Sequence, residues 1–168
     1  MANYILICMD GTDADGRLLR AAAVARNRIG AKLWPIYSGT RNRTDIKVGD
    51  RFVVYIGGQR EHAQEFVSTG FVAGMELPSE SRRADSPNLN EVGPPAHAWL
   101  RLMDIRDLEP AVSVRPLLDS LSFVPKNRKR WGVALMGGVR RISDDDLKLI
   151  LAVPRGALSL RLPERRFF

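Results

Sequence analysis

Four of the chain's aromatic side chains fall within residues 34–55, and their type suits the stacking of a flat ring. They are Trp34, Tyr37, Phe52 and Tyr55, with Pro35 and Ser38 beside the first two. An exposed Trp or Tyr ring stacks on a nucleobase for about 1–3 kcal/mol, and polar neighbours read the edge of the base. In a strand over 51–56, Phe52 and Tyr55 point to opposite faces, so we expect one in the core and the other beside a cleft. Periodicity alone favours the alternative, in which all four rings are core residues.

A cationic stretch at 126–141 predicts contact with a phosphate backbone. It contains no acidic residue, and its cations surround one apolar aromatic, Trp131. The candidate phosphate contacts are Lys126, Arg128, Lys129, Arg130, Arg140 and Arg141. Such contacts bind nucleic acid of any sequence and weaken steeply with salt. The alternative is a basic turn with Trp131 in the core, and the charged surface and the buried ring are compatible.

The net charge of +7 comes entirely from the last third of the chain. Residues 1–114 carry 14 basic and 14 acidic side chains, whereas residues 115–168 carry 12 basic and 5 acidic ones. An excess concentrated in this way indicates a face that binds a polyanion, and nucleic acid is the expected partner. The alternative is a solvated basic tail.

The residue patterns of common catalytic and metal sites are missing. The two histidines, His62 and His97, are isolated and the chain has one cysteine, which excludes a zinc constellation. Neither a phosphate-binding P-loop nor a Gly-x-Ser-x-Gly motif is present. Three consecutive acids, 144–146, would point about 100° apart on a helix, so we interpret them as a helix N-terminus instead of a magnesium site. The sequence therefore predicts a binding protein that is not an enzyme and has neither cofactor nor metal.

Length and composition predict one domain over residues 1–154, followed by a basic C-terminal tail at 155–168. No apolar run approaches the roughly 18 residues of a membrane span, so we expect no membrane association. The first residues lack the charged region of a secretion signal, and a single Cys8 suits a reducing compartment. We therefore expect a cytoplasmic protein.

The elements that would position these side chains can be outlined from periodicity and turn residues. Apolar runs predict strands over 3–9, 51–56, 65–75 and 97–105. Spacing of apolar residues predicts a helix over 14–29, with Thr12 or Asp13 as its cap and Gly30 at its end. Ser143 is expected to cap a second helix. The polar, Pro-rich segment 76–96 is longer than an ordinary connection, which is typical of a functional or disordered loop.

In their order and spacing, three segments resemble the EVE domain, a member of the PUA-like superfamily that also includes YTH domains. The first is Trp34 to Ser38 followed by Ile46 to Tyr55, which contains the Gly49-Asp50 pair at a strand entry. The second is the strand 65–72. The third runs over 121–127, then Trp131-Gly132, Gly137-Gly138 and 142–147, and is similar to EVE modules attached to modification-dependent restriction nucleases. The resemblance covers roughly residues 3–152.

This resemblance implies an α+β fold, a small twisted β-barrel flanked by helices, with a pocket for one flipped-out base. In YTH relatives the pocket holds a methylated adenine of RNA, and in nuclease-linked EVE relatives a modified cytosine of DNA. By position, Trp34 is the expected wall of the pocket and Ser38 a polar contact. Further candidates are Tyr37, Tyr55 and Asn90. Tyr4-Ile5 stands where many EVE proteins have an aromatic pair, which leaves the second wall open, with Trp99 as one option.

The function implied is a non-catalytic module that reads a modified base, with 5-methylcytosine or 5-hydroxymethylcytosine of DNA favoured. Its nucleic-acid partner would be DNA in preference to RNA. Its protein partner would be a nuclease domain or an effector subunit. One alternative is a PUA-like protein that binds modified tRNA or rRNA. A second is an ASCH-like hydrolase of modified nucleosides, for which Thr40, Lys47 and Glu65 supply the residue types but no defensible arrangement.

Overall fold

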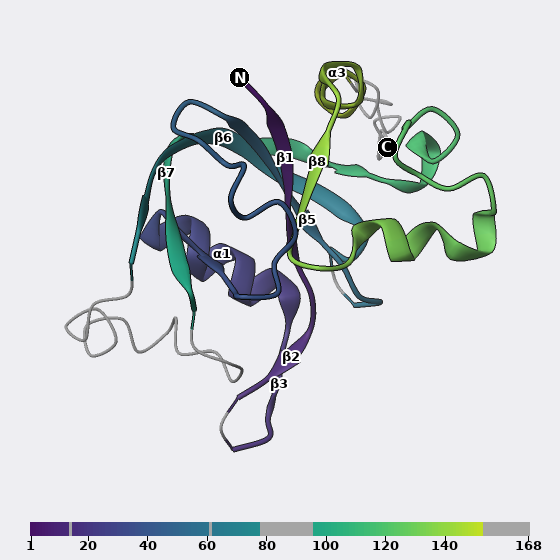
Figure 1. The fold of residues 1–168 in the computed structure, drawn as a ribbon. Helices are drawn as coiled ribbons and strands as arrows, with labels where there is room; N and C mark the ends of the chain where they lie inside the picture. The colour runs from purple at the N-terminus through teal and green to yellow at the C-terminus, as the bar shows by residue number, and fades with distance from the viewer. Residues whose placement is uncertain (14, 61, 78–95, 153–168) are drawn as a thin grey trace, which may run out of the picture.

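The computed structural model of the chain describes residues 1–13, 15–60, 62–77 and 96–152. A strongly bent sheet dominates it, with a helix on one face and short helical segments on the other (Figure 1). The elements are β1 (Asn3–Cys8), β2 (Gly11–Thr12), β3 (Leu18–Leu19), α1 (Ala21–Ala31), β4 (Leu33–Ile36), β5 (Arg51–Ile56), β6 (Glu65–Glu76), β7 (Ala98–Ser113), the 3-10 helices Arg115–Leu117 and Arg128–Leu135, β8 (Val139–Ile142) and α3 (Asp144–Ala152).

The main sheet has six strands in the order β4-β7-β6-β5-β1-β8. Strands β1 and β5 pair in parallel, and every other pairing in it is antiparallel. All six residues of β1 are buried, as expected for a strand covered on both faces. The α+β class predicted from the sequence is therefore confirmed.

Side chains of β5 alternate between two hydrophobic clusters, one on each face of the sheet. Phe52, Val54 and Ile56 belong to the cluster under α1, which we call the α1-side core. Val53 and Tyr55 belong to the cluster on the other face, which also contains Leu147 of α3 and which we call the α3-side core. Because both faces of β5 are covered, residues 52–56 are buried and closed to a ligand.

Helix α1 begins at Ala21, seven residues later than the sequence predicts. Residues 11–12 and 18–19 instead form the small β2–β3 hairpin. The predicted cap, Thr12 or Asp13, is wrong: Asp10 Oδ1 accepts the hydrogen bond of Ala21 N at 2.9 Å. The helix also continues through Gly30 to Ala31, and Lys32, with a φ of 56°, caps its C-terminus.

Strand predictions hold best where the apolar pattern is clear. β1, β5 and β6 lie within one residue of their predicted bounds. β7 extends eight residues beyond the predicted end at 105, because its second half pairs with β6 although residues 106–113 lack alternation. In the described part of the chain no helix has the length and apolarity of a membrane span. Residues 78–95 and the predicted tail lie outside the described residues.

Candidate nucleic-acid interface

The first half of the loop between β4 and β5 is held by its own hydrogen bonds. Thr40 Oγ1 accepts a hydrogen bond from Tyr37 N at 2.9 Å, and Thr40 N donates to Tyr37 O at 3.0 Å. Arg43 Nη1 donates to Ser38 O at 2.6 Å. The exposed Arg41 is therefore carried by a firmly folded turn.

The second half of this loop is anchored by Asp50. The Asp50 carboxylate accepts hydrogen bonds from Ala2 N at 2.7 Å and from Lys47 N at 2.8 Å. The preceding Gly49 has a φ of 87°, a conformation that favours glycine. The Gly49-Asp50 motif thus ties the loop to β1 and holds the exposed Lys47 at the mouth of a cavity of about 420 Å³, which Arg141 also lines.

The turn before β8 meets this loop from the opposite end of the sequence. Gly137 and Gly138 have φ values of 92° and 81°, and Ile7 N donates to Gly138 O at 2.8 Å. A Cβ atom added at Gly137 would lie 3.9 Å from Arg41, and one at Gly138 would lie 3.6 Å from Thr40 Oγ1. The fold therefore brings the two segments singled out by the sequence into contact.

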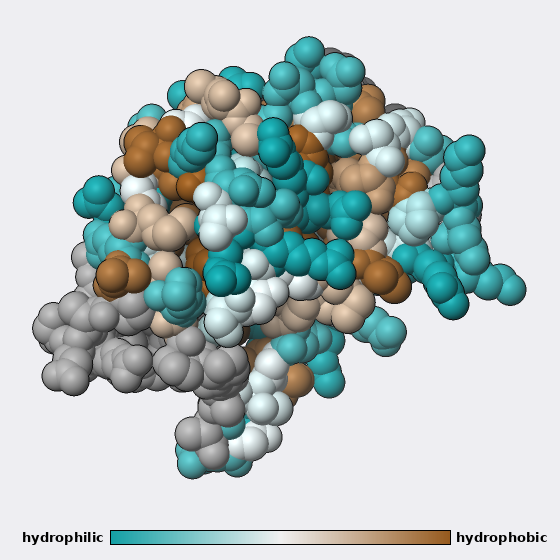
Figure 2. Space-filling view, in the orientation of Figure 1, coloured by the Kyte–Doolittle hydropathy of each residue, from teal (hydrophilic) through white to brown (hydrophobic). Residues whose placement is uncertain are grey.

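Both segments carry exposed cations. Figure 2 shows hydrophilic side chains across the middle of this face and along its edge beside the 125–136 segment. The exposed cations are Arg41, Lys47, Lys126, Lys129, Arg130 and Arg141, and we call these six residues the basic surface. Lys126, Lys129, Arg130 and Arg141 are thus placed where a phosphate can reach them.

Arg140, another predicted phosphate contact, is half-buried and engaged within the protein. Its Nη1 donates to Ala134 O at 3.0 Å and its Nη2 to Phe123 O at 3.2 Å, with the guanidinium 5.1 Å from the centre of the Phe123 ring. Burial, followed by the nearby charge of Arg41, lowers the pKa of Arg140. Arg140 therefore fixes the 3-10 helix, and Trp131 of that helix packs half-buried against the α3-side core.

Trp34, the expected wall of a base pocket, is sealed in the α1-side core. Its side chain is 1% exposed, and the Arg28 guanidinium of α1 lies 4.8 Å from the centre of its ring. The expectation that a base can reach this ring is wrong for the described structure, since β4 is buried along its whole length. Ser38 is exposed and Tyr37 half-exposed, just beyond the end of β4.

Tyr55 lies on the other face of the sheet from Trp34. Its ring packs 5.3 Å from Phe66 in the α3-side core, and burial raises its pKa to about 12. Phe52 and Tyr55 do point to opposite faces, but both are buried, so the prediction that one borders a cleft is wrong. Trp34 and Tyr55 cannot wall one pocket. Asn90 lies outside the described residues.

The three residues considered for a hydrolase are not brought together. Thr40 is buried with its hydroxyl bonded to Tyr37 N. Lys47 precedes the start of β5, whereas Glu65 pairs with Ile56 at its end. A six-residue strand separates them by roughly 17–20 Å.

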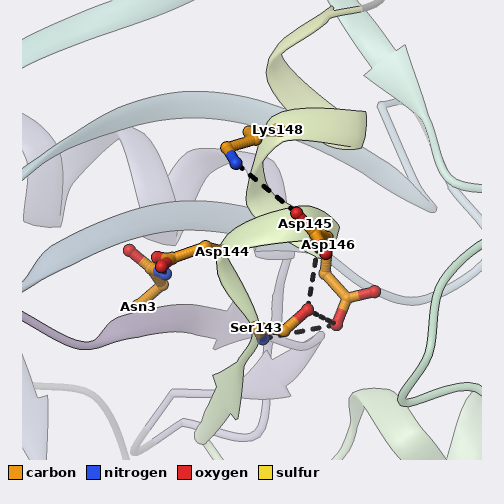
Figure 3. A network of polar contacts seen from close by, with 6 residues as sticks. All are labelled: Asn3, Ser143, Asp144, Asp145, Asp146 and Lys148. Atoms are coloured by element: carbon orange, nitrogen blue, oxygen red, sulfur yellow. Dashed lines mark hydrogen bonds and ion pairs between the residues drawn. The ribbon is translucent and has the colours of Figure 1, made fainter.

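The acidic triplet 144–146 forms a helix N-terminus, as the sequence predicts (Figure 3). Ser143 Oγ accepts a hydrogen bond from Asp146 N at 3.0 Å, and Asp144 Oδ1 accepts one from Asn3 at 2.6 Å. Asp146 is 2% exposed and accepts hydrogen bonds from Ser122 N at 2.7 Å and Ser122 Oγ at 2.6 Å. Among the described residues no group of acids, histidines and cysteines could hold a metal ion.

We expect replacement of Asp146 by Asn to destabilise the protein by about 2 kcal/mol at pH 7. Burial alone would raise the pKa of Asp146, but hydrogen bonds from Ser122 and Ser143 outweigh it and leave the pKa below the ordinary 3.8. A lowered pKa stabilises the fold above pH 3.8, and this contribution disappears as the pH falls through the folded-state value. The difference between the two proteins in urea unfolding should therefore shrink only as the pH falls below 3.8 and through the lowered folded-state pKa of Asp146. Asp145→Asn is the matched control, because the Asp145 side chain is 89% exposed.

Sequence reasoning missed Arg41 and Lys47 as members of the basic surface. Both stand in a polar loop with acids close by in sequence, so neither belongs to a cationic run. The sequence signal that could have indicated a fixed loop at these residues was the Gly49-Asp50 motif, which ties the loop to β1. The contact between Arg41 and the turn at Gly137 depends on residues almost a hundred positions apart.

Comparison with known sequences identifies relatives named UPF0310 proteins. The chain is 37% identical over 90 residues to one from Mycolicibacterium vanbaalenii, covering 54% of each chain. It is 33% identical over 107 residues to one from Pyrococcus abyssi, covering 62% of this chain and 73% of that protein. The chain thus spans about half the length of the first relative. No family model matches the sequence.

Solved structures with the same fold align along nearly the whole chain. The N-terminal domain of Staphylothermus marinus McrB has a TM-score of 0.59 and 12% identity, covering 90% of this chain and 94% of that one. Human THYN1, solved in complex with 5-methylcytosine containing DNA, has a TM-score of 0.56 and 8% identity, covering 90% and 96%. These matches agree with the fold that the sequence motifs indicate. The chain belongs to the UPF0310 family and has the EVE, PUA-like fold.

Proposed function

We propose that the protein is a non-catalytic nucleic-acid-binding module, with DNA as its preferred target. The observation that carries this proposal is the junction between the 37–50 loop and the Gly137-Gly138 turn, where Arg41 lies against the turn and Lys47 and Arg141 line one cavity. Fixed cations of this kind attract the phosphate backbone and release its counterions. One structure of the same fold holds DNA.

The finer part of the proposal is recognition of a modified base, with 5-methylcytosine or 5-hydroxymethylcytosine favoured. Its support is the resemblance to EVE modules and the 5-methylcytosine DNA bound to THYN1. Among the candidate residues, Tyr37 and Ser38 are accessible beyond the end of β4, and we assign the base contact to them. Base flipping would require a few kcal/mol of unstacking, which such contacts must offset.

The test is a set of short duplexes carrying cytosine, 5-methylcytosine, 5-hydroxymethylcytosine or N6-methyladenine, with matched RNA, at two salt concentrations. We expect tighter binding of modified-cytosine duplexes and strong weakening with salt. Equal affinity for all duplexes would remove base recognition and leave non-specific binding. Tighter binding of the RNA would favour the alternative of a modified-RNA binder.

Replacing Ser38 by Ala and Tyr37 by Leu should reduce the preference for modified cytosine about threefold to tenfold, because one stacking and one polar contact are lost. Binding of the unmodified duplex should change much less. The measurement is the ratio of the two dissociation constants for each variant. A preference that survives both substitutions would place the base contact elsewhere.

A further inference from the structure

We propose that the Gly137-Gly138 turn, Arg41 and Arg140 form a phosphate subsite at the edge of the basic surface. This inference rests on the proposed nucleic-acid binding and names where one phosphate group would lie. Three features of the described residues point to an anion at this place: unpaired backbone amides, an unpartnered guanidinium nitrogen and two neighbouring cations.

The first feature is the conformation of the turn. Gly137 O and Gly138 O accept hydrogen bonds from Val139 N at 3.0 Å and Ile7 N at 2.8 Å. Within the described part of the chain, neither glycine's own amide donates a hydrogen bond to another residue. Successive free amides in a turn with positive φ values form an anion-binding concavity.

The second feature is the Nε atom of Arg140. Both Nη atoms are used by the carbonyls of Ala134 and Phe123, whereas Nε is buried and has no partner among the described residues. A buried donor without an acceptor destabilises the fold, and more so when the group is charged. A phosphate oxygen reaching this nitrogen would remove that destabilisation.

The third feature is a pair of neighbouring guanidiniums, those of Arg41 and Arg140. Arg41 lies against the turn, and its charge acts together with burial to lower the pKa of Arg140. The acid that acts on Arg140 is Asp146, which is engaged by Ser122 and Ser143. Within the described residues the Arg41 side chain makes neither a hydrogen bond nor an ion pair. Two guanidiniums in this arrangement suit one phosphate, which accepts several charge-assisted hydrogen bonds.

Arg41→Gln tests the subsite, with Arg106→Gln as the matched control. Both side chains are exposed, and Arg106 lies on β7, four strands from β8 in the sheet. At 0.1 M salt we expect Arg41→Gln to weaken duplex binding about fivefold to tenfold and to lower the slope of log affinity against log salt by about 0.9. Arg106→Gln should leave both unchanged. Equal effects of the two substitutions would overturn the subsite.

Nuclear magnetic resonance of the unaltered protein supplies a readout that needs no substitution. The Arg140 Nε–H signal and the amides of Gly137 and Gly138 should shift when the duplex is added. Inorganic phosphate should shift the same signals at higher concentration. Phosphate shifts without duplex shifts would assign the site to free phosphate and overturn the proposal for nucleic acid.

The two proposals can fail separately. If no duplex or RNA binds, the proposed function is wrong, while phosphate-induced shifts at these signals would still support an anion site. If the duplex binds but Arg41→Gln behaves as the control and the three signals stay unmoved, the subsite alone is wrong.

Discussion

Replacing Trp34 by alanine will lower the free energy of unfolding by about 3–5 kcal/mol, a large part of the stability of a domain of this size. The ring is 1% exposed and packs in the α1-side core with Tyr4 and Leu100 among its neighbours in that cluster. Its removal leaves a cavity, and it also takes away the aromatic face under the buried Arg28 guanidinium.

The measurement is urea or thermal unfolding of the variant beside Trp99→Ala. Trp99 lies on β7 and pairs with Pro35 of β4, but its side chain is only half-buried, so its loss should cost clearly less. Binding of modified and unmodified duplexes by the Trp34 variant should fall together, because the folded fraction of the protein falls. A variant that remains fully stable and loses only the modified-base preference would contradict the buried placement of Trp34.

The second large effect concerns the basic surface. Replacing Lys126, Lys129, Arg130 and Arg141 by glutamine should weaken duplex binding by about two orders of magnitude at 0.1 M salt. The slope of log affinity against log salt should fall by about 3.6, since each lost phosphate contact removes about 0.9. All four side chains are exposed, so the fold should remain intact.

A matched variant separates the surface from net charge alone. The control variant also loses four positive charges, but from exposed positions outside the basic surface: Arg17, Arg20, Arg60 and Arg106 are replaced by glutamine. Salt titrations of both variants with one duplex give the comparison. If the two variants lose affinity equally, long-range net charge would explain the binding and the interface would lose its support.

The strands of this protein could be predicted closely from sequence where local and tertiary preferences agree. The apolar run 3–8 and the β-branched run 51–56 each form the strand expected of them. The predicted start of the first helix at residue 14 was wrong, because residues 18–19 pair with residues 11–12 in a hairpin. The helix instead begins at Ala21, whose amide donates a hydrogen bond to Asp10 across that hairpin. The predicted end of the last long strand at residue 105 was also wrong. Residues 106–113 have no alternating pattern of their own and form a strand because they pair with β6.

The candidate site was also predicted only in part, because local sequence patterns do not show which distant segments pack together. Exposed cations such as Lys129 follow from composition, since a run of like charges remains in solvent. The role of Arg140 did not follow, because its partners Ala134 and Phe123 are set by packing. Nor did the opposite placement of Trp34 and Tyr55, which depends on which face of the sheet each covers.

By itself, the sequence determined the α+β class, the cationic last third of the chain and the helix capped by Ser143, and it predicted nucleic-acid binding. Only the tertiary structure decided that Trp34 is sealed under Arg28 and that Arg41 meets the Gly137-Gly138 turn. Charge, capping and short apolar periods are local properties that a chain carries in any conformation. Burial and contact between distant segments arise only when the sheet closes, so they cannot be read from spacing along the chain.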